Sequence, residues 1–338
     1  MSNAALKWDL VSEPIRFSVI VPTFNRAHLL ADALRSICAV EYPSARYEII
    51  VVDNGSSDDT KAVVARFDEG PEHTVRYVLE PQRGYQFACN RGAVVARGEL
   101  LAYTDDDAEV TPGWLRALDA AYQGPHVGMA GGRVCVKWKT APPSWVRGFG
   151  AFPELDYGPE PMTLSWPQTI FGANLSIRKE LLLHVGGFNP STSMDEEFVG
   201  DGETGLCRKV YAAGWTIAWA PQALVNHVHD GASVTLRYVQ HREAQQARFA
   251  CYQAYKLRRH SAPELLVRGT IAALRSVRLK AVGSWRWALT HAIDHGSEIR
   301  ASAHAASAVY YGRLLFSATF RDAVVKDHWL VTGDDLGG

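Results

Sequence analysis

The chain has 338 residues and a mass of 37.2 kDa, with 47% apolar residues and a formal net charge of −1. This length suits one large domain, or one domain with a substantial appendage, and the apolar content is ample for a packed core. The near-neutral charge argues against a general nucleic-acid binder. The five cysteines are scattered without a CxxC pair, which favours reduced core thiols over a disulfide framework.

The N-terminal segment Met1 to Leu10 contains Lys7 and Asp9 and lacks a long apolar run, so we expect no signal peptide. The chain also has no uninterrupted apolar run of about 18 residues, so we expect no transmembrane helix. The sequence therefore predicts a cytoplasmic protein, either free or peripheral to the inner face of the membrane.

Patterns of buried strands and amphipathic helices alternate from Phe17 to Tyr103. The expected strands are Phe17 to Val21, Tyr47 to Val52, Val75 to Leu79 and Leu100 to Tyr103, and the expected helices are Ala27 to Ala39, Lys61 to Phe67 and Tyr85 to Ala96. This alternation predicts a parallel α/β sheet. Such sheets bind ligands beyond the carboxyl ends of their strands. Pro22, Thr23, Asp53 and the three aspartates Asp105 to Asp107 fall at that edge.

The second half of the chain divides at about Thr235. Gly131 to Pro167 is rich in Pro, Gly and Trp, and we expect loops and short strands over the sheet. Helices are expected at Arg178 to Val185 and Thr204 to Ala213, and a strand at Trp215 to Trp219. Beyond Thr235, long helical patterns continue to about residue 325 with a break at Pro263.

The run Asp105-Asp106-Asp107 places three like charges at the end of a buried strand. The outer pair, Asp105 and Asp107, can bind a divalent cation through two carboxylates and leave coordination positions for phosphate oxygens. A solvated acidic turn before Pro112-Gly113 is the alternative, and this short pattern by itself does not exclude it.

Longer stretches carry a family resemblance. FSVIVPTFNRAHLLADALRSI, YEIIVVDNGSSDDT, GYQFACNRGAVVARGELLAYTDDDAEVTPGWL, FGANLSIRKELLLHVGGF and GDGETGLCRKVYAAGWTIAWAPQALVNHV occur in this order. Together they resemble the family 2 nucleotide-sugar glycosyltransferases, from about Phe17 to Val228. The resemblance implies an inverting enzyme with the GT-A fold, a Rossmann-like and mostly parallel sheet flanked by helices. We expect this domain at 1–234, with a nucleotide-binding half at about 15–115, an acceptor half at about 116–234, and a helical region at 235–338.

The resemblance also implies the donor site. It assigns the nucleotide to Pro22, Thr23, Asn25, Arg26 and Asp53, with Arg83 and Asn90 beside it, and the sugar to Gly172, Ala173 and Asn174. It assigns a Mn²⁺ or Mg²⁺ ion to Asp107, with Asp105 reaching the ribose or metal-bound water and His227 as a third ligand, and leaves Asp106 the least essential of the three aspartates. The alternatives are a surface salt bridge for Arg26, helix capping for Asp53 and a buried structural histidine for His227. His229 is a weaker ligand candidate.

The general base has more than one candidate residue. Relatives usually carry a Glu-Asp pair before a helix with Leu-x-x-Arg, and this chain has Gly202 and Glu203 there. Glu203 is the expected base, Asp201 the second choice, and Glu196 and Glu197 stay open. Alternatively, Glu203 only stabilises the N-terminus of a helix through the helix dipole. Trp138, Trp145 and Trp166 are expected either to stack on an acceptor sugar or to belong to the core.

The helical region is rich in basic residues, which are Arg242, Arg248, Lys256, Arg258, Arg259, Arg268, Arg275, Arg278, Lys280 and Arg286, with Trp285 and Trp287 among them. They predict either a surface that touches anionic lipid or a solvated or dimer-forming face. The expected partners are a nucleotide sugar, with UDP favoured, and a glycan, lipid-linked or small-molecule acceptor, without nucleic acid. A nucleotidyltransferase and a non-catalytic sugar-nucleotide binder are the alternative functions.

Overall fold

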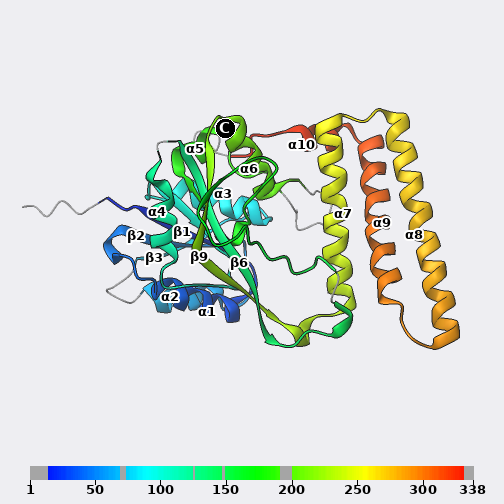
Figure 1. Ribbon diagram of the computed structural model, residues 1–338, viewed down its shortest axis with the longest axis horizontal. Coiled ribbons are helices and arrows are strands. Elements are labelled where there is room, and N and C mark those ends of the chain that lie inside the picture. The colour runs from blue at the N-terminus through cyan, green and yellow to red at the C-terminus, as the bar shows by residue number, and fades with distance from the viewer. Residues whose placement is uncertain (1–13, 69–73, 125, 147–148, 191–199, 331–338) are drawn as a thin grey trace, which may run out of the picture.

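The computed structural model describes residues 14–68, 74–124, 126–146, 149–190 and 200–330. The expectation about a signal peptide, and the base candidates Glu196 and Glu197, lie outside these residues. Four parallel strands form the N-terminal part of the sheet in the order β3-β2-β1-β4 (Figure 1). Their bounds are β1 (Phe17–Thr23), β2 (Tyr47–Asp53), β3 (Val75–Leu79) and β4 (Leu100–Tyr103), and the connecting helices are α1 (Ala27–Cys38), α2 (Thr60–Asp68) and α3 (Tyr85–Val95). These strands and helices confirm the sequence prediction.

The sheet continues from β4 with mixed direction. Its further strands, in the order in which they pair, are β8 (Leu175–Arg178), β6 (Val127–Thr140), β9 (Thr216–Asp230) and β5 (Ala108–Val110), with β7 (Met162–Leu164) also on β9. β8 is antiparallel to β4 and β6, β6 and β9 are parallel, and β5 and β7 are antiparallel to β9. The expectation of a mostly parallel sheet therefore holds for the first four strands and for the β6–β9 pair only.

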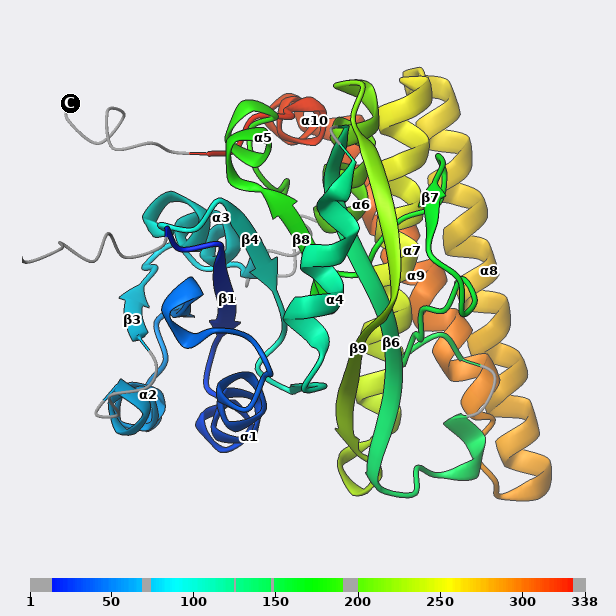
Figure 2. The same cartoon turned by 60° about the vertical axis from the view of Figure 1, so that its left-hand side comes forward.

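Two sequence expectations for this half are wrong. The segment that begins at Gly131, expected as loops and short strands, instead starts within a long strand, because β6 covers Val127–Thr140 and pairs along most of β9. The strand expected at Trp215 to Trp219 is β9, which extends to Asp230. Figure 2 shows these two long strands side by side, in front of the helical region. Their length matters because β9 carries His227 to the aspartate turn.

Apolar layers cover both faces of the sheet. Alternate residues of β1 divide between them, since Val19 and Val21 pack with α1 and α2 while Ile20 packs with α3. This alternation follows from the two-residue repeat of a strand. The remaining helices of this half are α4 (Trp114–Ala120), α5 (Lys179–His184) and α6 (Gly202–Ala212). α6 places its first turn beside the site described below.

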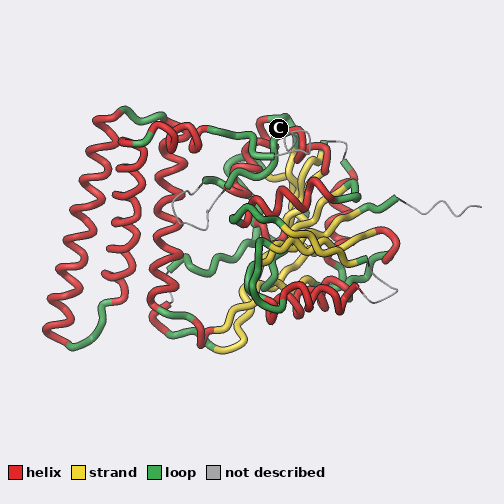
Figure 3. The backbone as a smooth tube through the Cα atoms, turned by 180° about the vertical axis from the view of Figure 1, so that it is seen from behind, coloured by secondary structure: helices red, strands yellow, loops and turns green. Residues whose placement is uncertain are grey.

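The C-terminal helices stand beside the sheet as a separate layer. They are α7 (Leu236–Arg258), α8 (Ala262–Thr290), α9 (His295–Phe316) and the short α10 (Ala318–Val325). In Figures 1 and 3, α7 is nearest the sheet, α9 comes next and α8 is outermost. Pro263 stands in the first turn of α8, where proline is tolerated. Among the described residues, the search for a helix long and apolar enough to cross a bilayer finds none.

Candidate active site

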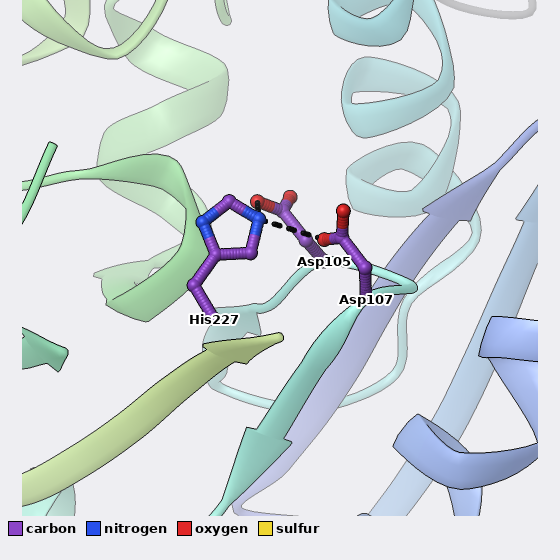
Figure 4. Close-up of side chains that lie close together, drawn as sticks. All are labelled: Asp105, Asp107 and His227. Atoms are coloured by element: carbon purple, nitrogen blue, oxygen red, sulfur yellow. Dashed lines mark hydrogen bonds and ion pairs between the residues drawn. The ribbon is translucent and has the colours of Figure 1, made fainter. Parts of the chain in front are cut away.

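Three side chains that can bind a metal ion meet beyond the end of β4. Asp105 and Asp107 lie in the turn between β4 and β5, and the pairing of β5 with β9 places Ala108 opposite His227. This register brings the imidazole to the turn, with its Nε2 2.8 Å from Asp107 Oδ1 and 3.9 Å from Asp105 Oδ2 (Figure 4). Each residue offers a ligand atom, and these atoms lie within 4.8 Å of one another.

The donor set of this cluster fits a divalent cation. Carboxylate oxygens suit Mg²⁺ and Mn²⁺, and an imidazole nitrogen shifts the preference toward Mn²⁺. Burial works against a charged imidazole, but the hydrogen bond to Asp107 and its negative charge raise the pKa of His227. The pKa of Asp107 is lowered despite its burial, because of this same contact, while burial above all raises the pKa of Asp105. A proton on His227 is thus stabilised where a cation would bind.

The middle aspartate points to a different neighbour. Asp106 is buried and accepts hydrogen bonds from the Thr23 hydroxyl (2.8 Å) and from Arg26 Nη1 (3.1 Å). The same Arg26 nitrogen lies 3.0 Å from Asp107 Oδ2. Burial raises the pKa of Asp106 to about 6, against the opposing charge of Arg26. Asp106 therefore joins the aspartate turn to β1, and Arg26 offsets the repulsion among the carboxylates.

Asp53 lies at the same edge of the sheet. Parallel pairing places it beside Thr23, where β1 and β2 end. Its buried carboxylate accepts hydrogen bonds from Ser56 N (2.8 Å) and from the Tyr77 hydroxyl (2.7 Å). Oδ1 thus holds the loop after β2, and Oδ2 bonds to β3. Because Ser56 precedes the start of α2 at Thr60, neither contact caps that helix. A carboxylate has about four acceptor positions, so a nucleotide N–H can still bind it.

The loop after β1 holds the other expected nucleotide residues. Asn25 adopts a positive φ of 53°, and its Oδ1 accepts a hydrogen bond from Ser57 N (2.8 Å). Arg83 lies over the Phe24 ring, 4.0 Å from its centre, and donates to a main-chain carbonyl. Pro22 is buried within β1. Arg83 and Asn25 thus make contacts within the loops after β1 and β2, and Pro22 is part of β1; their contact with a nucleotide stays a prediction.

Asn90 and Asn174 do not offer their side chains to the site. The Asn90 amide donates to the Phe188 carbonyl (3.1 Å) and accepts from the Phe188 N–H (2.8 Å). Asn174 is fully buried, donates to the carbonyls of Arg133 and Ala223, and accepts from Trp114 Nε1. Their amides join strands and loops, which corrects the expectation that these side chains contact the donor.

Glu203 faces the metal-ligand cluster from the first turn of α6. A side-chain carbon built on Gly172 would stand 3.9 Å from the Glu203 carboxyl carbon and 3.5 Å from the Tyr85 hydroxyl. That hydroxyl donates to Asp105 Oδ1 (2.6 Å). Gly172 thus lies between Glu203 and a tyrosine that is bonded to Asp105. Burial, with the negative charge of Asp105, raises the pKa of Glu203.

Asp201 is occupied elsewhere, although it precedes Glu203 by two residues. It is buried, and its carboxylate accepts hydrogen bonds from Asn189 Nδ2 (2.6 Å), the Tyr252 hydroxyl (3.1 Å) and Arg208 Nη2 (3.3 Å). These contacts join α6 to α7. The geometry favours Glu203 over Asp201 as the group that faces a substrate.

Sequence reasoning missed the role of Arg242, which it placed on a basic outer surface. The structure instead puts this α7 side chain near the site, where its positive charge acts on Glu203, His227 and His229. Its Nε is buried and has no hydrogen-bond partner. Pattern reasoning could identify the charge but not the face of α7 that packs inward. The sequence pattern also did not show that Tyr85, at the start of α3, bonds to Asp105.

Of the remaining candidates, three side chains pack against other rings, and one has a half-exposed ring. Burial, with the charge of His227, lowers the pKa of His229 to about 4, and its ring packs between Trp138 and Phe152. Trp145 stacks on the ring of His295, whereas Trp166 is half exposed. His229, Trp138 and Trp145 therefore have packing partners, and Trp166 alone of the three tryptophans offers a large exposed ring.

Comparison with known proteins agrees with this architecture. The chain is 25% identical over 210 residues to glycosyltransferase AglE of Haloferax volcanii, an alignment that covers 62% of this chain and 66% of that protein. It is 40% identical over 105 residues to the GalNAc(5)-diNAcBac-PP-undecaprenol beta-1,3-glucosyltransferase of Campylobacter jejuni, covering 30% and 33%. The chain thus spans less than two thirds of the length of either relative.

A solved structure supports the fold. The mannosyltransferase PcManGT from Pyrobaculum calidifontis, in complex with GDP-Man and Mn²⁺, matches with a TM-score of 0.53 at 22% identity, covering 94% of this chain and 90% of that one. This likeness confirms the GT-A fold with a C-terminal helical region. The family model for glycosyl transferase family 2 matches residues 18–186, which is half of the chain. The protein therefore belongs to glycosyl transferase family 2.

Proposed function

We propose that this protein is an inverting, metal-dependent glycosyltransferase that moves a sugar from a nucleoside-diphosphate sugar to an acceptor hydroxyl. One observation carries the proposal. The candidate base lies close to the candidate metal ligands, because Tyr85 is bonded to Asp105, and Tyr85 and Glu203 lie about the same glycine, Gly172. Family membership supports the reaction class, and the resemblance noted in the sequence implies inversion.

The residues divide the chemistry among them. Asp105, Asp107 and His227 would hold a Mn²⁺ or Mg²⁺ ion, which supplies positive charge to the departing diphosphate. Glu203 accepts the proton of the acceptor hydroxyl. The acceptor oxygen forms its bond to the anomeric carbon as the bond from that carbon to the diphosphate oxygen breaks, and the electron pair leaves with the diphosphate. A raised pKa suits Glu203 to this role, since a base works best when its pKa is near the working pH.

Arg242 supplies a second positive charge in this proposal. Contacts that follow it along the helix fix α7 against the rest of the fold, because Gln246 donates to the Gly150 carbonyl (2.7 Å) and Tyr252 donates to Asp201. A guanidinium held near Glu203 and His227 without an ion pair among the described residues suits a phosphate oxygen. We assign it to the diphosphate of the donor, so that the helical region completes the site.

The proposed donor and acceptor classes come from the sequence resemblance and from the similar proteins. UDP is the first nucleotide to test, as the sequence resemblance implies, and GDP the second, since the Pyrobaculum structure is a GDP-Man complex. The name of the Campylobacter relative describes a saccharide linked to undecaprenol. We therefore propose a glycan or glycolipid hydroxyl as the acceptor, with lipid-linked saccharides as the first class to test.

Binding and turnover separate this proposal from its rivals. Purified protein is heated with UDP, GDP or dTDP, each with Mn²⁺, with Mg²⁺ or with chelator. A nucleotide at a hundred times its dissociation constant adds about 2.7 kcal/mol to the free energy of unfolding, which raises the melting temperature measurably. Stabilisation that needs the metal, together with sugar release or transfer from the matching nucleotide sugar, supports the enzyme. Stabilisation without turnover across a sugar-nucleotide panel favours a non-catalytic binder, and turnover of nucleoside triphosphates favours a nucleotidyltransferase.

A further inference from the structure

Helix α8 has two apolar faces, of which only one has a partner in the fold. The inner face, with Leu265, Ala272, Ser276 and Gly283, is buried, and α8 packs along α9. On the opposite side, Val267 is 56% exposed, Leu274 64% and Trp285 66%. A helix of a globular protein normally has one apolar stripe, and its other side is polar.

The outer apolar residues form a continuous stripe. At 3.6 residues per turn, Val267, Leu274 and Trp285 fall along one line of the helix, and Ile271, Val282 and Leu289 fall beside it. All six are exposed. We call this set the outer face of α8. Because α8 is the outermost helix (Figures 1 and 3), the face is directed away from the sheet.

Positive charge accompanies this stripe. α8 carries five basic residues, Arg268, Arg275, Arg278, Lys280 and Arg286, and a single acid, Glu264, which caps the helix start. Arg278 stands within the stripe and Arg275 is exposed beside it, whereas the exposed Lys280 lies on another side of the helix. Arg286 pairs with Asp294. A helix with exposed apolar residues, tryptophan and an excess of arginine and lysine has the composition of a segment that lies in the interface of an anionic membrane.

We propose that the outer face of α8 binds the surface of an anionic lipid bilayer, with the helix parallel to the membrane plane. Apolar side chains would enter the headgroup region, and Arg275 and Arg278 would contact lipid phosphates. A second copy of the chain fits less well. A twofold contact through this stripe would place the same basic residues of both copies together, and like charges repel. This inference does not depend on the proposed reaction.

Vesicle flotation with the full chain tests the proposal. One set of vesicles contains phosphatidylcholine alone, and the other contains phosphatidylcholine with an equal amount of phosphatidylglycerol. We expect binding to the anionic vesicles only, weakening as salt increases. The double change Leu274→Ser/Trp285→Ser should weaken binding by about ten-fold or more. Arg275→Glu/Arg278→Glu should do the same, since each basic residue near an anionic surface contributes about 1 kcal/mol, or about five-fold.

Matched changes elsewhere act as controls. Leu79→Ser removes an exposed apolar side chain from β3, and Arg35→Glu/Arg116→Glu reverses two exposed charges on α1 and α4. Neither should alter flotation, and circular dichroism melting confirms that each variant folds. The proposal is overturned if the protein ignores anionic vesicles, or if the α8 variants bind as well as the controls. It is also overturned if light scattering without lipid shows a dimer that Trp285→Ser dissociates, because the face then binds a second copy.

Discussion

The sheet buries a charged side chain among polar partners, whereas the helical region leaves apolar side chains exposed. In the sheet, the carboxylate of Glu48 is fully buried and receives hydrogen bonds from Ser18, Arg76 and Arg97. In the helical region, Trp285 stands in solvent on the outer face of α8. Burying an unpaired charge destabilises a fold strongly, whereas exposing an apolar side chain costs less and leaves it available to a partner.

The sheet region and the helical region also contact each other directly, through charged side chains from both. Asp327, beyond α10, accepts hydrogen bonds from Lys256 of α7 (2.7 Å) and Arg208 of α6 (2.7 Å). Tyr252 of α7 reaches Asp201, and Arg242 of α7 reaches toward Glu203. The comparison therefore predicts that the helical region takes part in catalysis as well as in docking.

The largest expected effect lies on the sheet side. Asp107→Ala removes a metal ligand and the partner of His227, and we expect turnover to fall by about 10³-fold or more, because a metal ion supplies several kcal/mol to a leaving diphosphate. Stabilisation by nucleotide with Mn²⁺ should disappear as well. Asp119→Ala, which removes a carboxylate on α4 that pairs with Arg16, serves as a control. Normal turnover in Asp107→Ala would exclude the metal site proposed here.

Glu203→Gln should lower kcat by roughly 10²- to 10⁴-fold while nucleotide affinity stays unchanged. The sign of the pH dependence follows from the raised pKa of Glu203. Below that pKa the carboxyl is protonated and cannot accept the acceptor proton, so wild-type kcat should fall as the pH decreases, at a pH above the usual glutamate range. The variant should lose this acid limb. If its pH profile matches that of the wild type, another group is the base.

Arg242→Gln tests whether the helical region completes the site. We expect kcat/KM to fall by roughly 10²-fold, with weaker binding of nucleoside diphosphate and unchanged binding of nucleoside. The charge of Arg242 also opposes the raised pKa of Glu203, so its removal should shift the acid limb to higher pH. Arg237→Gln, an exposed arginine on the same helix, is the matched control. A variant with normal kinetics would make α7 a passive support.

Asp327→Asn should have the smallest effect, a loss of about 1–2 kcal/mol in the free energy of unfolding, since the side chain is half exposed. Although burial alone would raise it, the hydrogen bonds from Lys256 and Arg208 hold the pKa of Asp327 low. This stabilisation is fully present above the unfolded-state pKa and is lost progressively as the pH falls below about 4, so the two proteins should differ most near neutral pH and converge only in strongly acidic solution. Urea unfolding across this range measures the difference. A constant difference would show that ionisation of Asp327 is not its source.

The first four strands were predictable because each is a short, wholly buried apolar run between helical patterns. β6 was not, since its glycines and the Pro- and Trp-rich stretch after it suggested loops. Gly131 and Gly132 are needed for packing instead, because an added Cβ would come within 2.2 Å of Ile170 and 2.0 Å of the Ala223 carbonyl. β9 extends past the predicted end at Trp219, and Pro221 lies where the β6–β9 register shifts, so no ladder hydrogen bond is required of it.

Residues of the candidate site also differ in how far the sequence could predict them. The family resemblance proposed Asp105, Asp107, Glu203 and His227, and the structure brings ligand atoms of Asp105, Asp107 and His227 within 4.8 Å of one another, while their roles stay predictions. Asn90 and Asn174 were misassigned, since an amide serves equally well in a ligand site or in a buried hydrogen-bond network, and only the packed structure shows which.

By itself, the sequence determined the alternation of the first four strands with three helices, the acidic turn after β4 and the basic character of the C-terminal helices. The tertiary structure decided which side chains meet across long stretches of chain. The β5–β9 register brings His227 to Asp107, and the packing of α7 turns Arg242 inward while the outer face of α8 stays exposed. The physical reason is that periodicity and composition are local properties, whereas these meetings depend on how separate elements pack.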